Sequence, residues 1–541
     1  MRSVDTDPEL KELKNKVMHL AKTMGRTIPN IRFFILDPLE FASLLEKNVY
    51  PMSPVNIWEG KNMVTKKQRI ETGQESALYY EVVQTGNPSY AYLNATNNAM
   101  TQASVMAHVV GHCEFSELNV LRDSTPDRTE FVMHLVRKVK LGRQQMGDTH
   151  YRQYWNACES AIPLIATHSQ YNLAHSVESE IKIFPDPFPE PEPSKADTYL
   201  TPYSSTVEHL FHPQKMEAAF KQDLQQKIKS ETLSRSGYKL KVPCQDVFGF
   251  LRYYAPGSHA EKSIMDYLYT VHAPQDFVLR TQIMNEGWAM YWEKKIMLEL
   301  FKEKAVKGII EYARTFSGVC YPRPYFMRNP YHLGYHLWCH IEELYRKGKV
   351  TLDFLEESDQ KKKVEWEKHP KKDPMSEMEH LIRTMTDFEF LRRFLTPALV
   401  EEFQLNKVDK RMLRRFGISP DSIMREDAHF SYLNPVDVKQ EMLSFFTYFG
   451  RPRLYVIDSD FRDGGILLFH RNDGRHLKRA WIEPALKNIH YLWKGPVFLV
   501  TQNTLYQYSN NRLKKVEIPE PSFESIVERM QNNEKPFLWD E

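Results

Sequence analysis

Two histidines four residues apart give this sequence its first chemical signal. His108 and His112 lie in the segment MAHVVGHCEF, whose apolar spacing predicts a helix. Residues four apart on a helix share a face, so both imidazoles can bind one metal ion. Zinc peptidases of the H-E-x-x-H type use this geometry, with a glutamate as general base directly after the first histidine. Val109 holds that position here, so the segment indicates either a metal pair without the usual base or two structural histidines.

A glutamate in an aromatic segment is the predicted third ligand. Glu286 lies in QIMNEGWAMYWEKKI, where an acidic side chain is expected to be partly buried and therefore paired or metal-bound. With His108 and His112 it would form a three-ligand zinc site that leaves a fourth position for water or substrate. Glu293, two helical turns further on, is a candidate to support these ligands. The alternatives are a charge at a helix N-terminus and a buried salt bridge with an arginine or lysine such as Arg280.

A second histidine array lies in RNPYHLGYHLWCHIEEL. His332, His336 and His340 follow one another at intervals of four and span about 12 Å on a helix, so at most two can share an ion. An aromatic and histidine face packed against another helix is the alternative. In a hydrolytic enzyme we expect Glu114 to act as the base, and Tyr331 or His336 to stabilise the developing oxyanion. A surface position for Glu114 and ordinary packing for Tyr331 are the competing interpretations.

Composition narrows the classes of protein. Among 541 residues, 72 lysines and arginines against 70 acids leave a net charge of +2, which argues against a dedicated nucleic-acid binder. The five cysteines are widely spaced without a C-x-x-C pair, so a disulfide framework is not expected. No apolar run reaches membrane-spanning length, and the first residues do not resemble a secretory signal. We therefore expect a cytoplasmic protein.

The elements that must position these residues indicate an α+β fold. Helical periodicity covers 8–25, 94–121 and 258–316, and short strands are expected at 31–36 and within 78–93. We predict a large, mainly helical domain (1–435) with a zincin-like helical core around the metal site and a Pro-rich insertion near 184–205. A small β-rich domain is predicted for 436–541.

Several motifs, taken together, carry a family resemblance. They are HVVGHCEF (108–115), DVFGFLRYYAP (246–256), TQIMNEGWAMYW (281–292), NPYHLGYHL (329–337) and WKGPVFLVT (493–501). In this order they resemble the stage V sporulation protein R (SpoVR) family over roughly residues 30–505. The resemblance implies a cytoplasmic protein of sporulation, cell-envelope or stress physiology. It also implies association with a serine protein kinase and a von Willebrand-like protein. Two functions stay open: a zinc-dependent, hydrolase-like enzyme, and a non-catalytic regulatory or scaffold protein with a structural metal site or polar histidine cluster.

Overall fold

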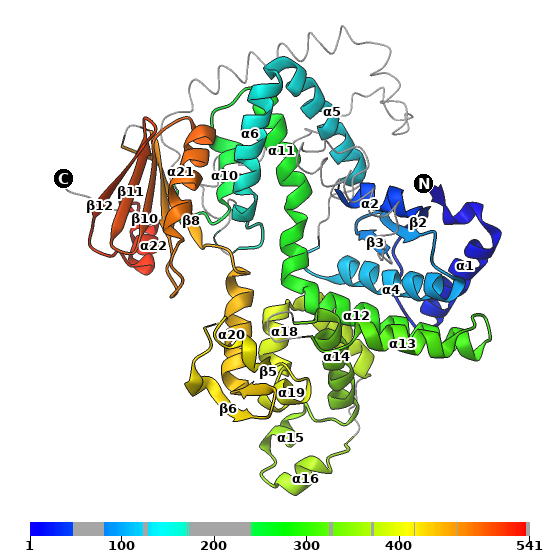
Figure 1. Ribbon diagram of the computed structural model, residues 1–541. Coiled ribbons are helices and arrows are strands. Elements are labelled where there is room, and N and C mark those ends of the chain that lie inside the picture. The colour runs from blue at the N-terminus through cyan, green and yellow to red at the C-terminus, as the bar shows by residue number, and fades with distance from the viewer. Residues whose placement is uncertain are drawn as a thin grey trace. The chain divides into compact units, whose positions relative to one another are not determined.

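The computed structural model describes most of the chain as an α+β protein in which helices predominate (Figure 1). The described residues are 1–46, 81–122, 128–169, 171, 240–323, 328–368, 373–415, 417–462 and 464–536. They divide into two compact units, Met1–Lys140 with Pro274–Gly450, and Leu141–Ala273 with Arg451–Glu541. The predicted Pro-rich insertion near 184–205 lies outside the described residues. Among those described, no helix is both long enough and apolar enough to cross a membrane.

Three packed helices form the centre of the first unit. Helix α12 (Pro274–Lys302) lies against both α4 (Ala99–Leu118) and α14 (Pro330–Arg346). Asn98 caps α4 by accepting a hydrogen bond from the Thr101 N–H. Asn329 caps α14 in the same way, with Pro330 at the first helical position, as the Asn-Pro pair predicts. Helix α4 is buried nearly all round, which explains its continuous apolar sequence.

Glycines allow the backbones of these helices to touch. A Cβ atom added to Gly111 of α4 would lie 2.6 Å from Cα of Ala289 on α12. A Cβ atom on Gly287 of α12 would lie 2.2 Å from the carbonyl carbon of Gly334 on α14. Neither crossing could accept a larger side chain without separating the helices. Gly111 directly precedes His112 and Gly287 directly follows Glu286, so the crossings bring the predicted ligands together.

A four-stranded sheet and shorter elements complete the first unit. The sheet has the order β1-β2-β4-β3, in which β2 and β4 are parallel and the outer pairs antiparallel. Its strands are β1 (Arg2–Ser3), β2 (Ile31–Leu36), β3 (Glu81–Gln84) and β4 (Ser89–Asn94). The other elements are α1 (Pro8–Thr23), α2 (Pro38–Glu46), α13 (Ile309–Val319), α15 (Leu352–Glu356), α16 (Gln360–Val364), α17 (Pro374–Thr384), α18 (Asp387–Phe394), α19 (Pro397–Glu402), α20 (Pro435–Tyr448), β5 (Lys407–Asp409), β6 (Ile423–Glu426) and β7 (Phe430–Leu433). Helix α5 (Arg128–Met146) runs from the first unit into the second.

The second unit is built on a five-stranded sheet of order β12-β11-β10-β9-β8. Strands β9 and β10 are parallel and are connected by α21, whereas the other neighbours are antiparallel. Its elements are α6 (Asp148–Ala161), α10 (Val247–Tyr254), α11 (His259–His272), β8 (Leu454–Phe461), β9 (Gly465–His470), α21 (Arg479–Trp493), β10 (Val497–Thr501), β11 (Thr504–Ser509), β12 (Arg512–Glu517) and α22 (Phe523–Gln531).

Each compact unit is built from two separate stretches of the chain. The first unit continues to Gly450, and Leu141–Ala273 joins the C-terminal residues. Helix α6 packs against α21, and the backbone of Cys244 pairs with that of Val456 on β8. Local periodicity does not reveal that segments so far apart in sequence share one core. The region predicted as β-rich, 436–541, also contains the helices α21 and α22. No disulfide joins the five cysteines, all of which lie within the described residues.

Candidate metal centre

Helices α4 and α12 bring the three predicted ligands together. Nε2 of His108 lies 3.6 Å from Oε2 of Glu286, and Nε2 of His112 lies 3.3 Å from the same oxygen. One ligand atom from each residue falls within 4.8 Å of the others. Zinc bonds of about 2.0–2.1 Å in a tetrahedral arrangement separate ligand atoms by about 3.4 Å. The spacing therefore fits three ligands of a single small cation.

The second nitrogen of each imidazole faces an acceptor. Nδ1 of His108 lies 2.9 Å from Oε2 of Glu293, whose other oxygen accepts a hydrogen bond of 2.6 Å from the Ser104 hydroxyl. Nδ1 of His112 lies 3.0 Å from Oδ1 of Asn285. In a metal-bound state, a proton on each Nδ1 would leave the lone pair of each Nε2 free to bind the ion. Metal-binding histidines are oriented by outer hydrogen bonds of this kind.

Glu286 is the acidic member of the three candidate ligands. The side chain is mostly buried, and no hydrogen bond from the described residues reaches its buried Oε2 atom. Burial opposes ionisation, but the imidazoles of His112 and His108 outweigh it and lower the pKa of Glu286 to about 2. The carboxylate is thus ionised at neutral pH and requires positive charge beside it. Protonated imidazoles or a bound cation can supply that charge.

Glu114, the predicted base, belongs to a different network. It is fully buried on α4, where one oxygen accepts hydrogen bonds from the Thr27 N–H at 2.8 Å and from the Arg26 guanidinium at 3.4 Å. The other oxygen accepts one from the Trp288 indole at 3.0 Å. Burial raises the pKa of Glu114 against the opposing effect of Arg26. Both oxygens are committed to these groups, so the placement does not support a role as base and also differs from the surface position considered as the alternative.

Tyr331 lies beside the ligands, whereas His336 does not. The ring of Tyr331, in the first turn of α14, lies 6.1 Å from that of His108. His336 packs against His332 and Phe403, with ring centroids 4.6 and 5.5 Å away. Burial lowers the pKa of His336 to about 4, helped by neighbouring positive charge, so this imidazole is neutral at pH 7. Tyr331 is therefore the better placed of the two predicted oxyanion donors.

In the histidine array of α14, the first two histidines, His332 and His336, pack against neighbouring side chains and backbone. Nδ1 of His332 lies 2.8 Å from the Cys320 carbonyl oxygen, and its Nε2 lies 3.3 Å from the Phe403 carbonyl oxygen. Burial lowers the pKa of His332 despite these two carbonyls. Within the described residues, this array forms no group of three candidate metal ligands. The arrangement matches the aromatic and histidine face that the sequence left as the alternative to a second metal pair.

Two residues of the site were missed by sequence reasoning. Asn285 directly precedes Glu286 in the motif, and its side chain contacts His112. Ser104 lies four residues before His108 on the same helical face and contacts Glu293. The spacing of Ser104 was a usable signal, because the i and i−4 positions share a face. Glu293 lies where the two-turn spacing from Glu286 suggested, in contact with His108.

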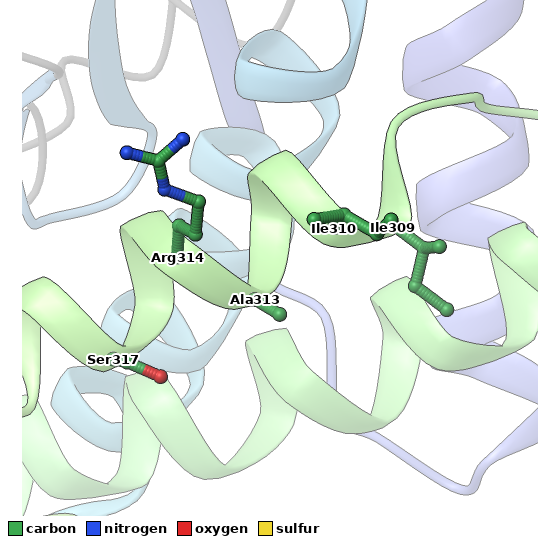
Figure 2. A pocket seen from close by; sticks show the side chains of 5 residues that line it. All are labelled: Ile309, Ile310, Ala313, Arg314 and Ser317. Atoms are coloured by element: carbon green, nitrogen blue, oxygen red, sulfur yellow. The ribbon is translucent and has the colours of Figure 1, made fainter.

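A shallow hollow on α13 lies outside this group. Its lining residues are Ile309, Ile310, Ala313, Arg314 and Ser317, all on one helix (Figure 2). None of them is an acid, an imidazole or a thiol. The hollow therefore offers no metal ligands and contributes no residue to the candidate centre.

The fold and the site define the chain as an α+β protein whose helical core carries a group of two histidines and one glutamate. Residues 5–430 match the family described as SpoVR like protein, so the chain belongs to the SpoVR-like family. It is 23% identical to the uncharacterized protein YcgB of Escherichia coli (strain K12) over 475 residues, covering 83% of this chain and 84% of that protein. No solved structure matches the chain. The family match over residues 5–430 includes all three candidate ligands.

Proposed function

We propose that this SpoVR-like protein binds one divalent metal ion, with zinc as the first candidate, through His108, His112 and Glu286. The observation that carries the proposal is the convergence of two Nε2 atoms and one carboxylate oxygen in a buried place. Outer partners at both Nδ1 atoms direct the lone pairs inward. Three protein ligands leave a position for water or substrate, as in catalytic zinc sites.

A hydrolase-like activity is the function that this ligand set supports best. A bound zinc ion supplies a Lewis acid and a water of lowered pKa. Tyr331, whose ring faces that of His108, is the residue we assign to hydrogen-bond a substrate or an oxyanion. Processes of the cell envelope, sporulation or stress remain the proposed setting, since the family resemblance implies them.

Among the described residues we assign no general base, and this favours a second candidate, a non-catalytic regulatory or scaffold protein. Val109 occupies the position of the usual glutamate. Glu114 is bonded to Arg26, Thr27 and Trp288, and Glu293 orients His108. In this version the metal is structural, and the proposed partners are a serine protein kinase and a von Willebrand-like protein.

Zinc titration of the metal-free protein tests the proposal. In competition with a chromophoric chelator, we expect the wild type to take up one equivalent of zinc. Glu286→Gln should weaken binding by more than the roughly 10–100-fold that loss of an outer partner costs. Glu299→Gln, a surface substitution on the same helix, is the matched control and should bind like the wild type. Equal affinity in all three proteins would refute the proposed ligands.

Activity and stability assays then separate the two candidate functions. Hydrolysis of peptide, amide or ester substrates by the zinc-loaded protein, lost in Tyr331→Phe, would support the enzyme. Inactivity across these substrates, with a melting temperature that collapses on chelation, would support a structural metal.

A further inference from the structure

The backbone of α12 is bonded to a side chain just before Glu286. The N–H groups of Ile283 and Met284 donate to the two carboxyl oxygens of Asp387, at 2.8 and 2.9 Å. In a regular helix interior these groups would bond to carbonyls four residues back along the same helix. Asp387 is the first residue of α18 and is completely buried. A carboxyl group from another helix thus holds two consecutive peptide groups of α12.

The same stretch is held from a second side by α14. The indole of Trp338 donates to the Met284 carbonyl oxygen at 3.0 Å. Gly334 packs so closely that an added Cβ atom would lie 2.0 Å from the carbonyl oxygen of Ile283. Met284 therefore has its N–H bonded to Asp387 and its carbonyl bonded to Trp338, two residues before the metal ligand.

We propose that Asp387 is a positioning residue for Glu286: it fixes the turn of α12 that aims this carboxylate at His108 and His112. The inference rests on the proposed metal site. Glu286 follows the two bonded peptide groups within one helical turn, so a change in their direction moves its side chain. Outer contacts of this kind determine how well a ligand set fits its ion.

Packing alone does not account for a carboxyl group at this place. Phe390, one turn along α18, packs against Trp338 with tilted rings whose centroids lie 4.8 Å apart, and already attaches this helix to the core. Burying an acidic group is costly unless its oxygens are hydrogen-bonded. What an acidic side chain adds here, beyond an apolar contact, is acceptance of hydrogen bonds from two backbone N–H groups of α12.

Zinc affinity and stability, measured separately in the full-length protein, test the role of Asp387. Asp387→Ala removes both acceptor oxygens, and we expect zinc binding about 10–100-fold weaker than in the wild type. Asp387→Asn keeps one acceptor oxygen, and its zinc affinity should lie between those of the wild type and Asp387→Ala. Asp246→Ala is the matched control, because Asp246 is also buried and accepts from two backbone N–H groups, those of Ala166 and Gly249, in the other unit.

The expected pattern is loss of stability in both alanine variants but loss of zinc affinity only at position 387. If Asp387→Ala does not fold, the zinc affinity and stability of two milder variants decide the question. These are Asp387→Asn and Trp338→Phe, of which the second removes the hydrogen bond to the Met284 carbonyl oxygen. In cobalt-loaded protein, an altered visible absorption spectrum of the Asp387 variants would show a changed ligand geometry. Wild-type affinity and spectrum in folded Asp387 variants would overturn this proposal alone. A wild type that binds no metal would overturn the proposed site together with it.

Discussion

Replacing Gly287 by alanine would press a methyl group into the backbone of Gly334. The new Cβ atom would lie 2.2, 2.4 and 2.6 Å from the carbonyl carbon, Cα and carbonyl oxygen of that residue. Ordinary carbon contacts are about 3.5–4.0 Å, so α12 and α14 would have to separate by about 1–1.5 Å. Overpacking costs up to about 3 kcal/mol, and alanine regains about 1 kcal/mol through its better helix propensity. We expect a net loss of about 2 kcal/mol.

Urea unfolding followed by far-UV circular dichroism and tryptophan fluorescence measures this loss. The matched control is Gly318→Ala on the exposed face of α13, where an added Cβ atom meets nothing within 4 Å. That variant should be unchanged or more stable by up to about 1 kcal/mol, because only helix propensity acts there. Equal stability of Gly287→Ala and Gly318→Ala would refute the backbone contact between α12 and α14.

Three further outcomes are expected. Glu293→Gln should weaken zinc binding by about 10–100-fold in a chelator competition assay, because His108 loses its charged partner; unchanged affinity would remove Glu293 from the site. Glu114→Gln should lower the free energy of unfolding by about 1–3 kcal/mol and leave zinc affinity intact, since the Arg26 contact lies outside the metal group; a loss of affinity would contradict that separation. Burial raises the pKa of Asp387 to about 8. The folded protein therefore holds a proton that the unfolded chain releases near pH 4, and stability should fall as the pH rises from about 4 to 8. Asp387→Asn should reduce this slope in urea unfolding series, and an identical slope would contradict the buried carboxyl.

Local sequence signals predicted the elements more reliably than their partners. The apolar spacing after Pro8 predicts helix α1, and the run at 31–36 predicts strand β2, both as observed. The Asn-Pro pair predicts the first residue of α14. These signals work because capping and periodicity depend on neighbours within one or two turns.

Long-range partners could not be read from the sequence in this way. Arg26 meets Glu114 across 88 residues, and Asp387 meets Ile283 across 104. Glu114 follows His112 by only two positions. On a helix, residues two positions apart differ by about 200° of rotation, so these two side chains point to opposite faces. The candidate ligands were accessible because an i and i+4 pair needs only one helix, and the apolar, aromatic surroundings of Glu286 indicated a buried carboxylate.

The metal content of the purified protein tests the proposed centre most directly. We predict about one divalent ion per chain in the wild type and a nearly metal-free His108→Ala/His112→Ala variant. The matched control is His332→Ala/His336→Ala, which removes a pair of the same spacing from α14 and should keep its metal. Substoichiometric metal in the wild type, unchanged by loss of His108 and His112, would contradict the metal centre.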